Sequence, residues 1–186
     1  TITCDSYFYG TINLNISGGE IESNIYGAGA GGVTGYSTTS SDTYKSYGEN
    51  FETSVNLNIS GGKISGNVYG GGYGYTEYLT EEVTATDGGA LYGSSNIKIS
   101  GSPTITGNIY AAGRGYNLSS KTSIAQTIGE TNIEISGSPA ITGQIFGAGE
   151  GISGYNDMAK LVGTSTIKIS SDLNTEVYGG GNIATT

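Results

Sequence analysis

A short sequence pattern recurs five times along this chain, and this recurrence constrains the fold more than any other feature. The first copy occupies residues 12–30, and every copy contains an Ile-Ser step that aligns it with the others. The aligned steps are Ile16-Ser17, Ile59-Ser60, Ile99-Ser100, Ile135-Ser136 and Ile169-Ser170, spaced by 43, 40, 36 and 34 residues. A spacing that varies in this way indicates a constant structural part followed by a loop of variable length.

The constant part of each copy predicts two short β-strands joined by a corner. In the first copy, Leu14 and Ile16 alternate with Asn13 and Asn15, and period-two alternation of this kind is typical of a strand. Gly18-Gly19 follows and predicts the corner, because glycine supplies positive φ angles. The later corners are expected at Gly61-Gly62, Gly101-Ser102-Pro103, Gly137-Ser138-Pro139 and Ser171-Asp172. The second strand is expected over residues 21–26, 64–69, 105–110, 141–146 and 173–178. Each copy is preceded by a short apolar step, at Phe8-Tyr9, Phe51, Leu91-Tyr92, Ile128 and Leu161-Val162.

One such copy cannot bury its own apolar face, whereas stacked copies share a continuous core. We therefore predict an all-β fold: a parallel β-solenoid of about five coils with variable loops on one side, in one domain over residues 1–186. A right-handed β-helix is expected, because parallel crossovers prefer that hand. At the spacing of paired strands, the stack would be roughly 24 Å long.

Stacking predicts columns of equivalent side chains. The four apolar columns are Leu14, Leu57, Ile97, Ile133 and Ile167; Ile16, Ile59, Ile99, Ile135 and Ile169; Ile21, Ile64, Ile105, Ile141 and Leu173; and Ile25, Val68, Ile109, Ile145 and Val177. On the outward face, Lys98, Glu134 and Lys168 follow Asn15 and Asn58, and their alternating charges favour pairing worth about 0.2–1 kcal/mol per pair. The column Asn24, Asn67, Asn108, Gln144 and Glu176 predicts an amide ladder.

Charge and composition exclude several classes of partner. The net charge is −9, with only seven Lys and Arg, which argues against nucleic acid and against anionic membrane surfaces. No apolar run is long enough to span a bilayer, so no membrane insertion of this segment is expected. The chain has no histidine and therefore lacks the commonest general base and metal ligand. Because the sequence opens in mid-pattern, we expect a fragment of a longer protein with flanking domains.

The motif Asn67-Val68-Tyr69-Gly70-Gly71-Gly72, which follows Ile59-Ser60-Gly61-Gly62, resembles repetitive surface proteins of Gram-positive, often gut-dwelling, bacteria. These are similar in turn to the pectin-lyase-like right-handed β-helix superfamily. The resemblance extends from about Phe8 to Gly181. It implies an extracellular location, at the bacterial cell surface or secreted, and an adhesin-like role. The superfamily also includes polysaccharide lyases and hydrolases, but the shared motifs specify no catalytic residue.

Two tyrosine series are candidate binding features. Tyr26, Tyr69, Tyr110, Phe146 and Tyr178 form a column that could be a platform for sugars, but we favour a structural ladder because phenylalanine replaces tyrosine in one copy. The second series is a Gly-Tyr-polar step in each internal loop, with Tyr36, Tyr75, Tyr116 and Tyr155. These rings could form a contact surface like that of an antibody, or each could fold back over its own coil. We include Arg114, the only arginine, in this candidate ligand-binding site because it adjoins Tyr116, although a structural role is the simpler interpretation.

Loop carboxylates offer a further alternative. Glu77, Glu81, Glu82 and Asp87 lie in one loop and Glu150 and Asp157 in another, and two such carboxylates could serve as acid and base or as calcium ligands. No calcium-loop motif is present, so a solvated acidic loop is favoured. We expect no catalytic residue, no metal site and no cofactor. The predicted function is a non-enzymatic binding module for a glycan or a host surface protein; the alternatives are a passive spacer of a surface protein and a carbohydrate-active enzyme.

Overall fold

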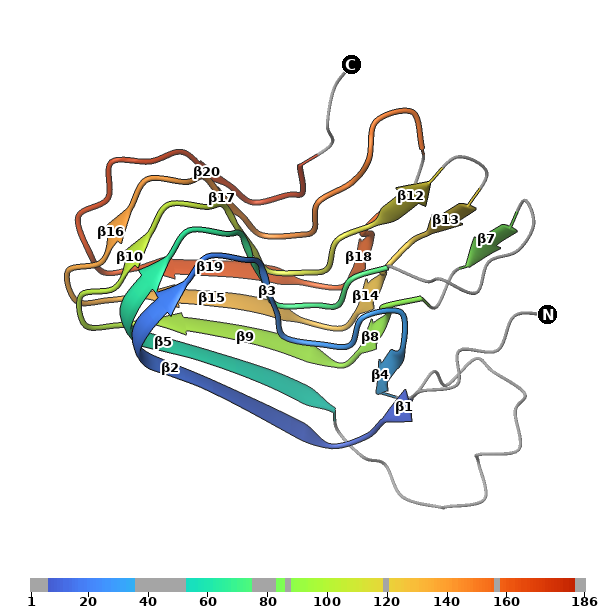
Figure 1. The fold of residues 1–186 in the computed structure, drawn as a ribbon, viewed down its shortest axis with the longest axis horizontal. Coiled ribbons are helices and arrows are strands. Elements are labelled where there is room, and N and C mark those ends of the chain that lie inside the picture. The colour runs from blue at the N-terminus through green and yellow to red at the C-terminus, as the bar shows by residue number, and fades with distance from the viewer. Residues whose placement is uncertain are drawn as a thin grey trace.

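The computed structural model describes residues 7–35, 53–74, 83–85, 88–118, 121–155 and 158–182. Within these ranges the chain forms only strands and connecting segments, and the strands assemble into four sheets (Figure 1). The all-β prediction is therefore confirmed for the described residues. None of their segments forms a helix long and apolar enough to cross a membrane.

The largest sheet, which we call the long sheet, carries the first strand of every repeat unit. Its strands are β2 (Thr11–Ile21), β5 (Ser54–Ile64), β9 (Ser94–Ile99), β15 (Thr131–Ile135) and β19 (Ser165–Ile169), joined by β10 (Thr104–Ile105) and β16 (Ala140–Ile141). All neighbouring strands are parallel, because each pair comes from equivalent positions in successive units.

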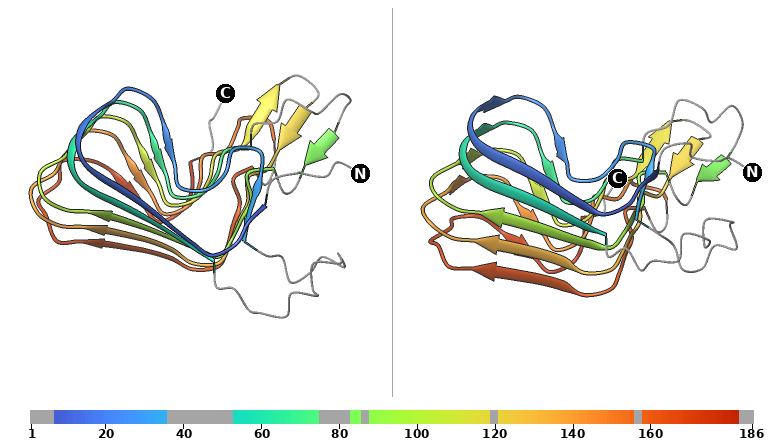
Figure 2. Two further views of the ribbon diagram at one scale, coloured as in Figure 1. Left: turned by 60° about the horizontal axis from the view of Figure 1, so that its bottom comes forward. Right: turned by 90° about the horizontal axis from the view of Figure 1, so that it is seen from below.

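Two further sheets repeat the same order of units. The tyrosine sheet contains β3 (Ile25–Tyr26), β6 (Val68–Tyr69), β11 (Ile109–Tyr110), β17 (Ile145–Phe146) and β20 (Val177–Tyr178). The lead-in sheet contains β1 (Tyr7–Phe8), β4 (Val33–Gly35), β8 (Leu91–Tyr92), β14 (Thr127–Ile128) and β18 (Leu161–Val162). Figure 2 shows the units lying one over the next, from the first unit in blue to the last in red.

The predicted columns are present wherever the strands pair. The register aligns Leu14, Leu57, Ile97, Ile133 and Ile167, and likewise the column from Ile16 to Ile169. The column from Ile25 to Val177 is equally regular. The column that begins at Ile21 is paired as far as Ile141, but Leu173 lies outside any strand and only packs against the core.

The structure corrects the predicted second strand. Residues 22–24 and their equivalents are not in strand conformation, so the segment expected over 21–26 consists of two short pieces separated by a bend. The first piece belongs to the long sheet and the second to the tyrosine sheet. The bend lets each unit enclose the core from two sides, which a single straight strand could not do.

The predicted corners coincide with positive φ angles at glycine. Gly19 has φ 82°, Gly62 88°, Gly101 65° and Gly137 81°. In the first two units, however, β2 and β5 continue through the corner with register shifts between them. The long sheet therefore curls at this point in the first two units, whereas the corner separates two strands in the third and fourth.

The second lead-in strand also differs from the prediction. Phe51 was expected to provide it, but Val33–Gly35 pairs with β1 on one side and with β8 on the other. Phe51 itself lies outside the described residues. This strand therefore precedes the longest variable segment instead of following it.

The core lies between the long sheet and the tyrosine sheet. Its buried members are the inward isoleucines, leucine and valine of both sheets, and Leu57, Ile99 and Ile145 are fully buried. Glycine lets the units approach closely at the bend: an added Cβ at Gly66, Gly107 or Gly143 would overlap the backbone of the preceding unit. Close approach of this kind leaves no room for other residues at these positions.

Three short strands from the described parts of the loops form a small sheet beside the stack. There, β12 (Tyr116–Leu118) pairs antiparallel with β13 (Lys121–Ser123), which pairs in parallel with β7 (Val83–Ala85). This loop sheet joins the second and third units at the side visible in Figures 1 and 2.

Candidate functional site

The aromatic column forms a continuous stack on the tyrosine sheet. Ring centroids are 4.8 Å apart for Tyr26 and Tyr69 and 4.9 Å apart for each later pair, with interplanar angles of 5–8°. Tyr69 and Tyr110 are fully buried, so their faces are unavailable to a sugar. The structural interpretation of this column is therefore the better one, because the ring faces pack against each other.

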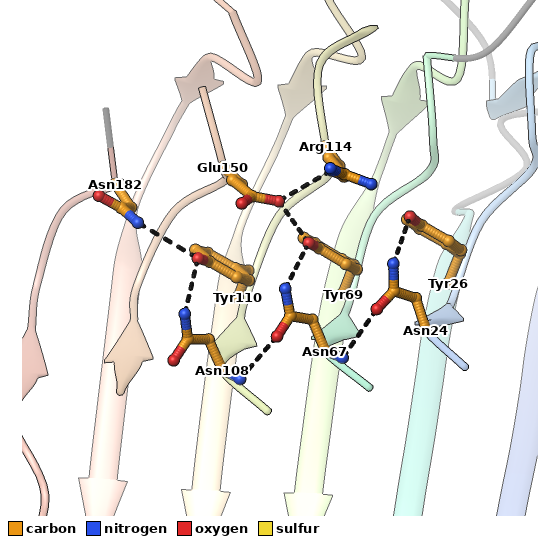
Figure 3. A network of polar contacts seen from close by, with 9 residues as sticks. All are labelled: Asn24, Tyr26, Asn67, Tyr69, Asn108, Tyr110, Arg114, Glu150 and Asn182. Carbon is orange, nitrogen blue, oxygen red and sulfur yellow. Dashed lines mark hydrogen bonds and ion pairs between the residues drawn. The ribbon is translucent and has the colours of Figure 1, made fainter. Parts of the chain in front are cut away.

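Asparagines two residues earlier hold the ring hydroxyls (Figure 3). The Nδ2 atoms of Asn24, Asn67 and Asn108 donate to the hydroxyls of Tyr26, Tyr69 and Tyr110 at 3.0–3.2 Å. Their Oδ1 atoms accept the backbone N–H of the equivalent residue in the next unit, each at 2.8 Å. The predicted amide ladder is thus present, but it runs through the backbone and not from amide to amide.

A second column lies next to the aromatic stack. It consists of the residues four positions after each stacked aromatic residue in the sequence. Its members are Ala30, Tyr73, Arg114, Glu150 and Asn182, linked by isolated parallel bridges. Asn182 donates to the Tyr110 hydroxyl at 3.3 Å, and Tyr73 stacks on Tyr26 with centroids 5.1 Å apart. This column brings together an aromatic ring, a cation and an anion, whereas each apolar column keeps one kind of side chain.

Arg114 is the centre of this second column. Its Nε atom lies 2.9 Å from Glu150 Oε2, and its guanidinium lies 5.5 Å from the centroid of the Tyr73 ring. Partial burial opposes its charge, but a hydrogen bond to Tyr26 and the nearby Glu150 carboxylate outweigh that effect and raise the pKa of Arg114. The Arg114 side chain remains 38% exposed, so it can still meet a ligand.

The Tyr69 hydroxyl donates to the same oxygen of Glu150 that Arg114 contacts. Burial, followed by this hydrogen bond, raises the pKa of Tyr69. Burial likewise raises the pKa of Tyr110 and of Tyr73. These hydroxyls remain neutral donors and acceptors at neutral pH, and Glu150 links the two columns across three units.

The structure brings only part of the predicted binding site together. Tyr116 makes an edge-on contact with Tyr73, with centroids 5.9 Å apart at 85°, and Arg114 lies over the same Tyr73 ring. Tyr155 is 39% exposed in the loop after Glu150. Tyr36 and Tyr75 lie outside the described residues. We call Tyr73, Arg114, Tyr116 and Glu150 the Arg114 patch.

Sequence reasoning missed Tyr73 as a partner of Arg114 and Glu150 as its anchor. Both lie four residues after an aromatic residue of the stack, and that constant offset is visible in the sequence. The residue types at this offset vary, which concealed the column.

A hollow of about 340 Å³ lies on the outward face of the long sheet. Its floor is an amide ladder in which the Nδ2 atoms of Asn56, Asn96 and Asn132 donate to the preceding Oδ1 at 3.0–3.1 Å. Asn58, Lys98 and Glu134 also line it. The predicted charge pairing occurs beside it, since Lys168 Nζ lies 3.8 Å from Glu134 Oε1. The sequence shows this ladder as asparagine at one phase in four copies, beginning with Asn13.

The carboxylates considered for catalysis or calcium binding are only partly described. Glu150 is engaged by Arg114 and Tyr69, while Glu77, Glu81, Glu82, Asp87 and Asp157 lie outside the described residues. Within the described ranges, no group of three or more acidic, histidine or cysteine side chains could hold a metal ion.

Comparison with known proteins gives no match from which a role for these surfaces could be inferred. No protein-family model, no curated protein and no solved structure matches this chain.

Proposed function

We propose that this chain is a non-enzymatic binding module, built as a right-handed β-solenoid and displayed at a bacterial cell surface or secreted, that recognises a glycan or a host surface protein. Parallel in-register stacking of equivalent strands supports the solenoid, and the known preference of parallel crossovers supports its hand. The acidic charge and the motif resemblance support the location.

The observation that carries the proposal is the geometry of Arg114. Its guanidinium is held by Glu150 and lies against the Tyr73 ring, yet more than a third of the side chain is exposed. Arginine and tyrosine are, with tryptophan, the residue types enriched at binding hot spots. Because the parallel units and the ion pair restrain these side chains before any ligand arrives, less conformational entropy is lost on binding.

The chemistry of the Arg114 patch fits a polar ligand with both apolar and hydrogen-bonding faces. Tyr73 and Tyr116 offer ring surface, and Arg114 and Glu150 offer a cation and an acceptor. A sugar ring meets these requirements, because its C–H face packs on an aromatic ring while its hydroxyls bind charged groups. A protein segment with a tyrosine or an acidic side chain meets them as well.

The test is a glycan and host-protein array probed with the folded chain, with and without calcium. We expect specific binding that falls about tenfold or more in Arg114→Ala and Tyr116→Ala, because loss of a hot spot costs more than about 1–2 kcal/mol. Lys98→Ala, at the long-sheet hollow, is the matched control and should bind as the parent does. Calcium dependence would point to the acidic loop that contains Glu81 and Asp87.

Two outcomes would contradict this proposal. A folded sample that binds nothing would do so, and so would binding that survives Arg114→Ala and Tyr116→Ala together. Binding lost in Asn96→Ala instead would keep the function but move the site to the hollow. Tyr155→Ala tests the wider loop surface in the same assay.

A passive spacer is the second candidate, and the satisfied ladders favour it. Arg114, Glu150 and Asn182 each make contacts with aromatic residues two units earlier in the stack. A spacer needs only these stabilising contacts between units and no ligand-binding surface. It predicts that Arg114→Ala lowers the free energy of unfolding and that no array component binds.

A further inference from the structure

The Arg114–Glu150 ion pair keeps one carboxylate oxygen available. The Arg114 Nε atom and the Tyr69 hydroxyl both contact Oε2 of Glu150, and Figure 3 shows both contacts on this one oxygen. Among the described residues, no hydrogen bond reaches the second oxygen, Oε1. A carboxylate oxygen accepts hydrogen bonds through its lone pairs, so Glu150 retains an acceptor that no neighbour uses.

Arg114 likewise retains hydrogen-bond donors. A guanidinium carries several N–H groups in a fixed fork. The polar side chains that Arg114 contacts in the described part of the chain, Glu150 and Tyr26, engage only some of them. The side chains of Arg114 and Glu150 are 38% and 22% exposed, so a ligand can reach both. The pair therefore presents donors and an acceptor next to each other at one accessible place.

The charges of this pair select against anions. The two charges cancel, and the chain as a whole has a net charge of −9. A carboxylate or sulfate that approached Arg114 would lie within a few ångströms of the Glu150 carboxylate, and like charges at that separation repel each other. A neutral ligand meets no such repulsion, and its hydrogen bonds to these two ions are stronger than bonds between neutral groups.

The arrangement of the pair separates two classes of neutral ligand. A peptide amide has one donor and one acceptor, but its N–H and C=O groups point in opposite directions because the peptide bond is planar and trans. One amide therefore cannot reach both Arg114 and Glu150, which lie side by side with Nε and Oε2 2.9 Å apart. Two hydroxyls on neighbouring carbons of a sugar ring can reach both, since each hydroxyl donates and accepts and the two oxygens lie close together.

We propose that the Arg114–Glu150 pair binds a vicinal diol of a neutral sugar. One hydroxyl accepts a hydrogen bond from the Arg114 guanidinium, and the neighbouring hydroxyl donates to Oε1 of Glu150. The Tyr73 ring lies against the guanidinium and contacts Tyr116, so aromatic side chains flank the bound sugar. This assignment rests on the proposed binding function, and it narrows the ligand from a glycan or a host protein to a neutral sugar.

Glu150 determines the specificity of this pair for a neutral ligand. In Glu150→Gln the Tyr69 hydroxyl still needs an acceptor, because Tyr69 is fully buried. The carbonyl of the new amide serves that hydroxyl, which leaves the amide N–H groups in the place of Oε1. The variant then presents donors only and lacks the counter-charge of Arg114, so it should disfavour a diol and accept an anion.

The experiment is an NMR titration of the purified chain with the methyl glycosides of galactose, glucose and mannose, followed by three derivatives of the sugar that binds. The first derivative lacks the C3 hydroxyl and so has no vicinal diol, because its remaining ring hydroxyls, at C2 and C4, are not neighbours. The second carries a sulfate on C3. The third lacks the C6 hydroxyl, keeps the diols and is the matched control ligand.

We expect a neutral glycoside to bind with an affinity that is the same at low and high salt, because salt screens only interactions between charges. Removal of the C3 hydroxyl should weaken binding about tenfold or more, the cost of a lost hydrogen bond to a charged group. The C3 sulfate should bind more weakly than the neutral sugar. The derivative without the C6 hydroxyl should bind as the complete sugar does.

In Glu150→Gln the order of the neutral sugar and the C3 sulfate should reverse. Glu134→Gln is the matched control variant, because it removes the same charge at the long-sheet hollow, and it should keep the order of the parent chain. Circular dichroism must show that both variants fold. If Glu150→Gln does not fold, Arg114→Lys replaces it; this variant keeps the charge but loses the planar fork, and it should lose the neutral sugar.

The assignment is overturned if no neutral glycoside binds, if the sugar without a C3 hydroxyl or the C3 sulfate binds as well as the neutral sugar, or if Glu150→Gln keeps the order of the parent chain. The glycan and host-protein array distinguishes this failure from that of the proposed function. A host protein or an acidic glycan whose binding is lost in Arg114→Ala supports the proposed function and overturns the diol assignment. A folded chain that binds nothing on the array overturns both.

Discussion

Tyr69 is fully buried, and its hydroxyl is hydrogen-bonded to both Asn67 and Glu150. Burial and the Glu150 contact raise its pKa, so the folded chain keeps this proton at pH values where the unfolded chain releases it. Above about pH 10, the ordinary pKa of tyrosine, the unfolded state binds fewer protons than the folded state. The stability contributed by the neutral hydroxyl is therefore complete below about pH 10 and is lost as the pH rises further.

We predict that the free energy of unfolding falls steeply above about pH 10, and that Tyr69→Phe reduces the slope. Urea unfolding followed by circular dichroism between neutral and alkaline pH measures both. Phe146 shows that a ring without a hydroxyl is accepted in the stack, so the variant should fold. Tyr155→Phe, at an exposed ring, is the control; equal slopes for the parent and Tyr69→Phe would contradict the prediction.

The asparagines at the bend, such as Asn67, link each unit to the next by accepting a backbone N–H of that unit. Asn67 accepts the Asn108 N–H with its Oδ1 atom and donates to Tyr69 with its Nδ2 atom, whereas Asn58 makes an amide-to-amide bond to Asn15 on the outward sheet face. Removing the Asn67 side chain leaves a partly buried backbone donor without its partner. Removing Asn58 leaves groups that water can reach.

We expect Asn67→Ala to lower the free energy of unfolding by about 1–3 kcal/mol, the cost of an unsatisfied buried group. Asn58→Ala should change it by less than about 0.5 kcal/mol. Asn67→Asp keeps the acceptor and loses the donor, so it should fall between the two. Denaturant titration of the three variants gives the order of their free energies of unfolding. An equal loss of stability in Asn58→Ala and Asn67→Ala would contradict the prediction that the bend asparagines contribute more.

At the scale of the whole molecule, burial is uneven along the stack. The long-sheet strand of the second unit alternates between buried and half-buried positions, whereas that of the last unit has no buried position and β20 is exposed throughout. In a stack where each unit contacts only its neighbours, end units have one interface and middle units have two. Local opening should therefore cost least at the ends.

We predict that amide hydrogen exchange is slowest in β5, β9 and β15 and fastest in β19 and β20, by mass spectrometry of the chain at low concentration. Uniform protection along the stack would contradict the nearest-neighbour account.

The repeat pattern by itself determined the strands of the long sheet, their parallel register and the membership of the apolar columns. A shift of the strand register by one residue would turn every inward isoleucine to the solvent face, so only one register is stable. It also located the corners, where Gly19 and Gly62 adopt positive φ angles. It did not determine the bend at residues 22–24 or the place of Val33–Gly35, because these depend on how closely neighbouring units approach. Only the tertiary structure placed Tyr73, Arg114 and Glu150 over the aromatic stack, because their residue types differ from unit to unit and so hide the constant offset that they share.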